Sequence, residues 1–224
     1  MPGHSLFAGK SHVVFDAYGT LLDVHSAVQR HAMQVGPEAG ALSGLWRVKQ
    51  LEYTWVLSLI GRYQSFWSLT EQALDYALAR HPNVDPALRQ PLLDAYRDLD
   101  AYPEVPTILT RLRAAGQRTA IFSNGNQSML DRAVASAGLT DRLDAVLSVD
   151  DVEIFKTAPK AYQLVLDRLG VTAAEVVFCS SNRWDVAGAS AFGFTTVWVN
   201  RQGVPEEYPE LRPAAVIKDL EGLL

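Results

Sequence analysis

The stretch Val13-Val14-Phe15-Asp16-Ala17-Tyr18-Gly19-Thr20-Leu21-Leu22-Asp23 is the part of the sequence around which the rest of the chain is organised. Its first three residues are apolar and either β-branched or aromatic, which is typical of a short strand buried on both faces. The strand ends at Asp16, and Gly19 then allows a sharp turn. The carboxyl ends of strands in an open α/β sheet face the ligand crevice. Asp16 is therefore expected to face a reactant, where a carboxylate can act as a covalent nucleophile.

The composition is that of an ordinary globular protein. Hydrophobic residues make up 48% and charged residues 20% of the 224 positions, and this length suffices for one domain or for a core with an insertion. The net charge of -5 argues against a bulk nucleic-acid binder, which would carry a basic face. A nucleic-acid partner is therefore not expected.

The cysteine content and the hydropathy indicate a cytoplasmic protein. Cys179 is the only cysteine, so no internal disulfide can form and a reducing compartment is expected. Its position in an apolar run predicts a small buried side chain. The residues from Met1 to Lys10 lack the apolar centre of a signal peptide. No apolar run approaches the length that spans a bilayer, so we expect no membrane association.

A long helical stretch separates the first strand from a regular alternation of strands and helices. Helical patterns occupy residues 26–34, 42–60, 68–80 and 85–96, and the second of these is expected to bury one apolar face: Leu45, Val48, Leu51, Trp55 and Leu59. Helices are expected at 105–115, 127–137 and 186–192, with strands at 118–122, 145–148, 175–179, 196–200 and 214–217. This order predicts an α/β fold whose parallel-sheet core comprises residues 1–22 and 101–224. Residues 23–100 are predicted to form an inserted helical cap, which excludes water and completes the site.

Two strings in the chain resemble a known family. An isolated Asp at a strand end can simply cap a turn, but the longer string D-x-x-G-T-L at residues 16–21 resembles the first motif of the haloacid dehalogenase superfamily. The Asp of that motif attacks the substrate. Residues 45–55, LWRVKQLEYTW, resemble the cap helix of the type II L-2-haloacid dehalogenases. The resemblance implies a Rossmann-like parallel sheet with a helical cap, no metal and no cofactor.

The same resemblance implies a substrate-binding set. The Arg that matches Arg47 receives the departing halide, and a fixed guanidinium is suited to stabilising that charge. Ser123 and Asn124 match the residues that bind the substrate carboxylate. A helix N-cap is the alternative role for this pair, and both roles can hold together. The backbone N–H groups of Ala17 and Tyr18 are implied to assist them. An apolar pocket is implied for Leu51, Phe66 and Trp184, whose spacing would also suit an ordinary core.

The remaining motifs complete a catalytic network. Lys156 and Tyr162 match the family's Lys and Tyr, although Thr157 stands where the family usually has Pro after the Lys. The family's S-S-N-x-W-D loop is matched by Ser180-Ser181-Asn182-Arg183-Trp184-Asp185. The implied reaction is displacement of the halide by Asp16 with inversion, followed by hydrolysis of the resulting ester. Asp185, Lys156 and Asn182 are implied to hold or activate the water. The remaining roles are orientation of the carboxylates by Thr20 and Ser180, and support of the network by Tyr162.

Two positions distinguish a dehalogenase from the phosphatases of the same superfamily. Phosphatases usually carry a general-acid Asp two residues after the nucleophile, where this chain has Tyr18, and a halide leaves without a proton. They also hold Mg²⁺ with G-D-x-x-x-D in the last loop, where Ser181 replaces the first Asp. The sequence therefore predicts metal-free hydrolysis of short L-2-haloalkanoic acids to D-2-hydroxy acids.

Two other activities are considered beside dehalogenation, and the assembly is a separate question. A Mg²⁺-dependent phosphatase acting on a small metabolite is the second hypothesis. A catalytically silent binding protein is the third, and its mark would be the loss of Asp16, Lys156 or Asp185, all of which are present. Family members are often dimers, and the Trp-rich cap offers one interface, although core packing explains the same aromatic residues.

Overall fold

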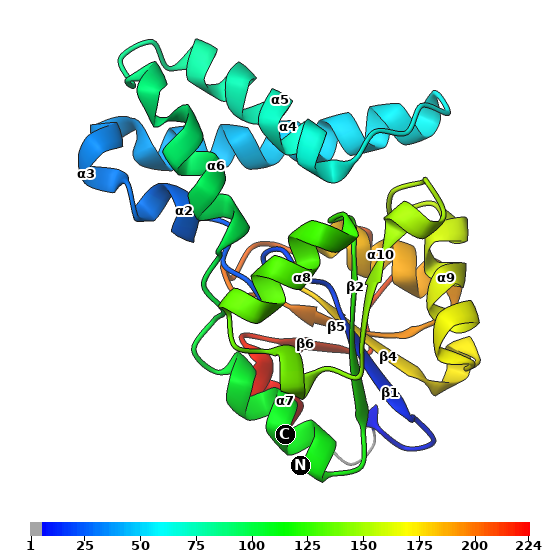
Figure 1. The fold of residues 1–224 in the computed structure, drawn as a ribbon. Helices are drawn as coiled ribbons and strands as arrows, with labels where there is room; N and C mark the ends of the chain where they lie inside the picture. The colour runs from blue at the N-terminus through cyan, green and yellow to red at the C-terminus, as the bar shows by residue number, and fades with distance from the viewer. Residues whose placement is uncertain (1–5) are drawn as a thin grey trace.

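The computed structural model describes residues 6–224, so the first five residues of the predicted core segment lie outside the described range. Within that range, parallel strands form one sheet in the order β3-β2-β1-β4-β5-β6 (Figure 1). The strands are β1 (His12–Phe15), β2 (Arg118–Ser123), β3 (Ala145–Ser148), β4 (Val176–Ser180), β5 (Thr195–Val199) and β6 (Ala215–Ile217). The predicted α/β fold with a Rossmann-like parallel sheet is confirmed.

Strand β1 lies at the centre of the sheet and is buried throughout. Its last residue, Phe15, lies beside Ile121 of β2 and Cys179 of β4. The backbone N–H of Asp16 then donates to the Cys179 carbonyl at 3.0 Å, which extends the pairing by one residue. Since strand order reverses between β1 and β4, their carboxyl ends flank the position at which open α/β sheets bind ligands.

Helices cover both faces of the sheet. They are α7 (Val105–Ala114), α8 (Gln127–Ser136), α9 (Pro159–Leu169) and α10 (Arg183–Phe192). Crossover connections between parallel strands are right-handed, so α7 and α8, which lead toward β3, lie on one face, and α9 and α10 lie on the other (Figure 1). Helix α9 was not anticipated from the sequence, whereas α7, α8 and α10 were.

A second group of helices lies above the carboxyl ends of the strands (Figure 1). These are α2 (Ser26–Gln29), α3 (Ala32–Val35), α4 (Ala39–Leu59), α5 (Phe66–Arg80) and α6 (Arg89–Arg97). The single helix predicted at 26–34 is wrong, because a tighter i→i−3 hydrogen bond from His31 to Val28 ends α2 and turns the chain. The chain enters and leaves this group side by side, with the Asp23 N–H donating to the Asp100 carbonyl at 2.8 Å.

Helix α4 buries a different face from the one that its apolar spacing predicted. The expected face comprised Leu45, Val48, Leu51, Trp55 and Leu59. Val48 and Leu59 are instead 56% and 87% exposed, while Trp46 and Gln50 are buried. Trp46 Nε1 donates to the Thr70 carbonyl at 2.9 Å and Gln50 Nε2 to Thr70 Oγ1 at 3.0 Å. The core between α4 and α5 thus includes polar side chains whose hydrogen bonds are satisfied.

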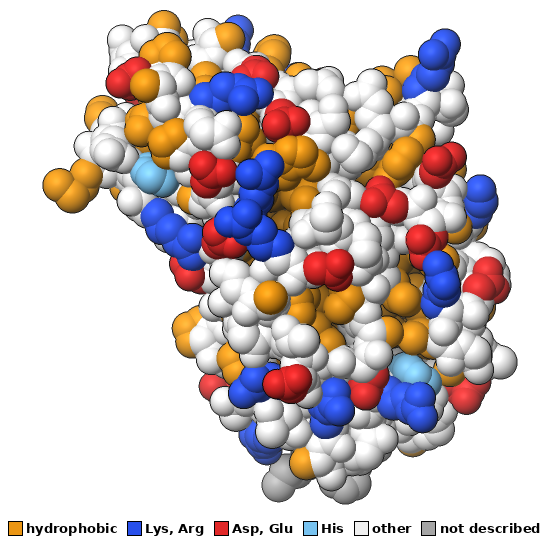
Figure 2. Space-filling model, viewed as in Figure 1, with side chains coloured by type: hydrophobic (Ala, Val, Ile, Leu, Met, Phe, Trp, Pro, Cys, Tyr) orange, Lys and Arg blue, Asp and Glu red, His pale blue; other side chains and the backbone are white. Residues whose placement is uncertain are grey.

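The surface and the single cysteine are as the composition suggested. Lys and Arg side chains are interspersed with Asp and Glu over the face drawn in Figure 2. Across residues 6–224, no helix has both the length and the apolar character needed to cross a bilayer. Cys179 is a buried free thiol on β4, and burial raises the pKa of this thiol.

Candidate active site

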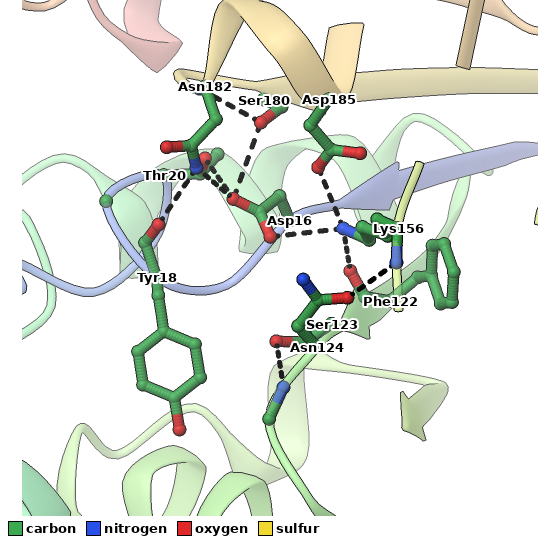
Figure 3. Close-up of polar contacts among 12 residues, drawn as sticks. Asp16, Tyr18, Thr20, Phe122, Ser123, Asn124, Lys156, Ser180, Asn182 and Asp185 are labelled. Carbon is green, nitrogen blue, oxygen red and sulfur yellow. Dashed lines mark hydrogen bonds and ion pairs between the residues drawn. The ribbon is translucent and has the colours of Figure 1, made fainter. Parts of the chain in front are cut away.

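A buried ammonium joins two carboxylates at the carboxyl end of the sheet (Figure 3). Lys156 Nζ lies 3.1 Å from Asp16 Oδ1 and 2.8 Å from Asp185 Oδ2. Its third hydrogen bond goes to the Phe122 carbonyl at 2.7 Å. All three ammonium protons are therefore used. Lys156 and Asp185 are fully buried, so the attraction between them acts in a region from which water is excluded.

The second oxygen of Asp16 is held by neutral donors (Figure 3). Asp16 Oδ2 accepts from Asn182 Nδ2 at 2.7 Å, from Thr20 Oγ1 at 3.1 Å and from Ser180 Oγ at 3.4 Å. These donors come from the turn after β1 and the loop after β4. The carboxylate is thus fixed in one orientation, which removes part of the entropic cost of reaction.

Asp185 is placed to titrate near neutrality. Burial raises its pKa to about 6 against the opposing effect of the Lys156 ammonium, and the charge of Asp16 adds to the rise. Tyr162 Oη donates to Asp185 Oδ1 at 2.8 Å, which favours the charged form. Burial also raises the pKa of Tyr162 well above its usual value. Tyr162 therefore remains a donor while Asp185 gains or loses its proton.

The turn after Asp16 leaves two backbone donors unused. Gly19 has φ of +89°, a conformation that side chains rarely adopt, and its N–H donates to the Leu22 carbonyl at 2.7 Å. Within residues 6–224, the N–H groups of Ala17 and Tyr18 donate no hydrogen bond. Donors of this kind beside a strand end can bind an anion.

A small closed cavity lies over Asp16. Its volume is about 10 Å³, and it is lined by Asp16, Tyr18, Arg47, Leu51, Phe66, Ser123, Asn124 and Trp184. Such a volume holds at most one water molecule. The lining includes every predicted substrate-binding residue except Ala17, which is buried in the adjacent turn. Helices α4 and α5 provide part of the wall, through Arg47, Leu51 and Phe66.

One end of the cavity carries unsatisfied donors. Asn124 Oδ1 accepts from the Lys156 backbone N–H at 2.9 Å, while the buried Asn124 Nδ2 has no partner among the described residues. Ser123 Oγ accepts from the Gly125 N–H at 3.1 Å, which leaves its own proton free to donate. A Cβ at Gly125 would lie 2.7 Å from Tyr18 Cε2, so only glycine fits there. This end suits a carboxylate.

The other end presents a cation on an apolar wall. Arg47 of α4 reaches across to the sheet, where its Nη2 donates to the Tyr18 carbonyl at 3.3 Å. No ion pair joins Arg47 to a carboxylate of residues 6–224. The Tyr18 ring lies 5.8 Å from Phe66 and 5.8 Å from Tyr96, so the surroundings are aromatic. An unpaired guanidinium in such a setting attracts a small anion.

Comparison with known proteins assigns the chain to a family. The model of the haloacid dehalogenase-like hydrolases matches residues 10–193. The (S)-2-haloacid dehalogenase 1 of Pseudomonas sp. (strain CBS-3) is 49% identical over 215 residues, which cover 94% of this chain and 95% of that protein. The chain belongs to the L-2-haloacid dehalogenases. This family assignment confirms the one made from the sequence motifs.

Further L-2-haloacid dehalogenases agree in sequence and in fold. The (S)-2-haloacid dehalogenase 4A of Burkholderia cepacia is 52% identical over 196 residues, covering 87% of this chain and 85% of that protein. The L-2-haloacid dehalogenase of Xanthobacter autotrophicus, solved with chloropropionic acid covalently bound, superposes with a TM-score of 0.86 at 39% identity and covers 96% of both chains.

Two residues of this dehalogenase have contacts with the site that the sequence did not reveal. Ser181 donates from its N–H to Thr20 Oγ1 at 2.9 Å and from its hydroxyl to the Gly19 carbonyl. Arg201, which follows β5, donates to the Thr20 carbonyl at 2.8 Å and pairs with Glu104 at 2.7 Å. Both residues hold the turn that contains Thr20, a donor to Asp16. The sequence marked Ser181 only as the replacement for a phosphatase Asp, and Arg201 belongs to no motif segment.

We expect Arg201→Met to lower kcat by about ten- to a hundredfold with little change in KM, because a shift of the Thr20 turn misplaces Asp16 relative to the substrate. Arg201→Lys should recover part of the loss, since an ammonium can still donate to the Thr20 carbonyl. Steady-state halide release measures both constants. Arg212→Met, on an exposed Arg of the same region, is the matched control. An unchanged kcat together with a lower melting temperature would assign Arg201 a purely structural role.

Proposed function

We propose that this protein hydrolyses short L-2-haloalkanoic acids to D-2-hydroxy acids through an ester on Asp16. The observation that carries the proposal is the small cavity, which provides one group for each part of such an acid. Asn124 Nδ2 and Ser123 Oγ are available to the carboxylate, and Arg47 to the halogen. Asp16 lies between these two ends, beside the carbon that carries the halogen.

The first step is a displacement at that carbon. An oxygen of Asp16 forms a bond to C2, and the carbon–halogen bond breaks with its electron pair leaving on the halide. Attack from the side opposite the halogen inverts the centre. The halide is stabilised by the Arg47 guanidinium and leaves without a proton, so no general acid is required. The Tyr18 position, where a phosphatase carries its acid, can therefore hold a phenol.

The second step hydrolyses the ester at its carbonyl carbon. Asp185 accepts a proton from water as the water oxygen attacks. The bond between the carbonyl carbon and the ester oxygen then breaks, and Asp185 returns the proton to the departing alkoxide oxygen, which becomes the hydroxyl of the product. The bond from C2 to its oxygen is retained, so the inverted configuration persists in the product. Lys156 and Asn182, which already donate to the oxygens of Asp16, stabilise the negative charge of the intermediate.

The phosphatase alternative is disfavoured by the donor set of this chain. Mg²⁺ binds through carboxylates and water in an octahedral arrangement. Here the Lys156 ammonium contacts both Asp16 and Asp185, and the remaining oxygens of these carboxylates accept hydrogen bonds. Over residues 6–224, no group of three or more His, Cys, Asp or Glu side chains is arranged to hold a metal ion. The residues present do not fit a magnesium site.

Halide release from L- and D-2-chloropropionate, with and without EDTA, tests the proposed function. We expect chloride from the L isomer only, unaffected by EDTA, and D-lactate as the product on a chiral column. A phosphate-release assay with small phosphomonoesters and Mg²⁺ should give no activity. Equal activity on both isomers, or phosphate release that EDTA abolishes, would contradict the proposal.

The pH dependence follows from Asp185. Only its charged form accepts a proton from water, and its pKa is about 6, so kcat should fall as the pH drops below about 6. Tyr162→Phe removes a hydrogen bond that favours the charged form, which raises the pKa of Asp185 further. The acid limb should then move to higher pH, as measured by chloride release from pH 4 to 9. An acid limb that stays in place in this variant would exclude Asp185 as its origin.

The organisation and assembly of the protein complete the proposal. We propose that residues 23–100 form a cap subdomain on a core of residues 1–22 and 101–224, in a cytoplasmic enzyme. We also propose a homodimer that covers the exposed side chains of Val48 and Val56 on α4 and of Ile60 directly after it. Sedimentation velocity should give the mass of a dimer, and Val56→Glu should give a monomer. A wild-type monomer at micromolar concentration would contradict this assembly.

A further inference from the structure

We propose that an open apolar groove next to the active site binds the alkyl tail of 2-haloalkanoic acids longer than propionate, and that Trp184 is the gate between groove and site. This inference rests on the proposed function and names a wider substrate class for it. The groove has a volume of about 940 Å³ and is lined by residues from the end of α4, from α10, and from the segment that leads into α9. Its apolar lining includes Trp55, Leu59, Ile154, Ala191, Phe192 and Leu211.

Trp184 belongs to the walls of both spaces. Its side chain lines the closed cavity over Asp16 and also the open groove. The indole meets that of Trp55 edge to face, with ring centres 5.6 Å apart and planes at 82°. Trp184 of α10, which packs against Trp55 of α4, therefore separates the cavity from the groove. A rotation of Trp184 away from Trp55 would join the two spaces.

A bound haloacid of any length displaces part of the cavity lining, because only about 10 Å³ is free over Asp16. Trp184 is the one lining residue that the cavity shares with the groove. The groove begins on the other side of the same indole. A tail attached to C2 would pass Trp184 while the carboxylate stays at Ser123 and Asn124.

The chemistry of the groove selects an alkyl chain. Lys156 is the only Lys, Arg, Asp or Glu among the residues that line it. Its ammonium is already used by Asp16, Asp185 and the Phe122 carbonyl, so no free charge faces the groove. Ser58, the polar residue at the α4 end, accepts from the Phe155 N–H at 3.2 Å. Each methylene buried on such a surface improves binding by about fourfold.

Chain-length profiles of groove variants test the proposal. Ala191 is an exposed residue of α10, so Ala191→Glu places a charge in the groove, and Ala191→Trp fills it. We measure bromide release from L-2-bromopropionate and L-2-bromooctanoate. In the wild type, kcat/KM for the octanoate should equal or exceed that for the propionate. Both variants should lower the ratio of kcat/KM for the octanoate to kcat/KM for the propionate at least tenfold. Ala135→Glu, on an exposed Ala of α8 away from the groove, should leave both constants unchanged.

The outcomes separate this inference from the proposed function. No bromide from either substrate in the wild type would overturn the proposed function itself. Rapid release from the propionate with a hundredfold lower kcat/KM for the octanoate would overturn the tail site alone, as would an unchanged ratio in both Ala191 variants. A change of assembly state in Ala191→Glu, seen by sedimentation, would assign the groove to a second copy of the chain and overturn the proposal.

Discussion

Asp16→Asn is expected to lower halide release from L-2-chloropropionate by at least about 10⁴-fold, the scale on which the loss of a nucleophile acts in other hydrolases. The amide keeps the size of the carboxylate but is a far weaker nucleophile, so no ester forms. Its neighbours constrain the amide further, because Lys156 and Asn182 both donate to this side chain and an NH₂ group cannot accept from them. Both the chemistry and the local hydrogen bonding are therefore disturbed.

Mass spectrometry distinguishes this loss from unfolding. Rapid quenching of the wild type during turnover should give a peptide containing Asp16 with the added mass of the propionate group, and the variant should lack it. Asp141→Asn, on an exposed Asp, provides the control for an Asp-to-Asn change elsewhere. Freshly prepared Asp16→Asn with full turnover would contradict the mechanism. Activity that rises over hours indicates instead that the amide has hydrolysed back to Asp.

The positions of the motif residues follow from the topology. Asp16, Ser123 and Ser180 end or directly follow β1, β2 and β4, and the carboxyl ends of neighbouring parallel strands meet at one edge of a sheet. An alternation of strands and helices was therefore enough to expect that residues more than a hundred positions apart would lie together. The 2.7 Å contact between Asn182 Nδ2 and Asp16 Oδ2 is an instance.

The sequence was less informative about side chains that donate hydrogen bonds to backbone carbonyls or to a side chain on another helix. Arg201 holds the Thr20 carbonyl, and every residue has a carbonyl, so no residue pattern marks this contact. Gln50 is buried because Thr70, on another helix, accepts its hydrogen bond. Apolar periodicity counts Gln50 as solvent-facing and so assigned the wrong face of α4.

Arg47→Met is expected to lower kcat/KM for L-2-chloropropionate by about 10²- to 10³-fold, the loss typical when one preorganised donor to a developing anion is removed. The loss should be largest for chloride, smaller for bromide and smallest for iodide, because the better leaving groups need less stabilisation. Hydrolysis of the ester on Asp16 should proceed at its normal rate, since Arg47 contacts the Tyr18 carbonyl rather than the Lys156 and Asp185 network.

Halide release from the three 2-halopropionates, together with rapid-quench measurement of the ester, tests this order. Lys49→Met removes a positive charge from the same helix, where Lys49 pairs with Glu52 and does not line the cavity over Asp16, and should change kcat/KM less than threefold. An equal loss for all three halides in Arg47→Met would mean that the guanidinium orients the bound acid and does not stabilise the leaving group. The dependence on the halogen therefore separates leaving-group stabilisation from simple binding, because only an interaction that strengthens in the transition state scales with the charge on the halide.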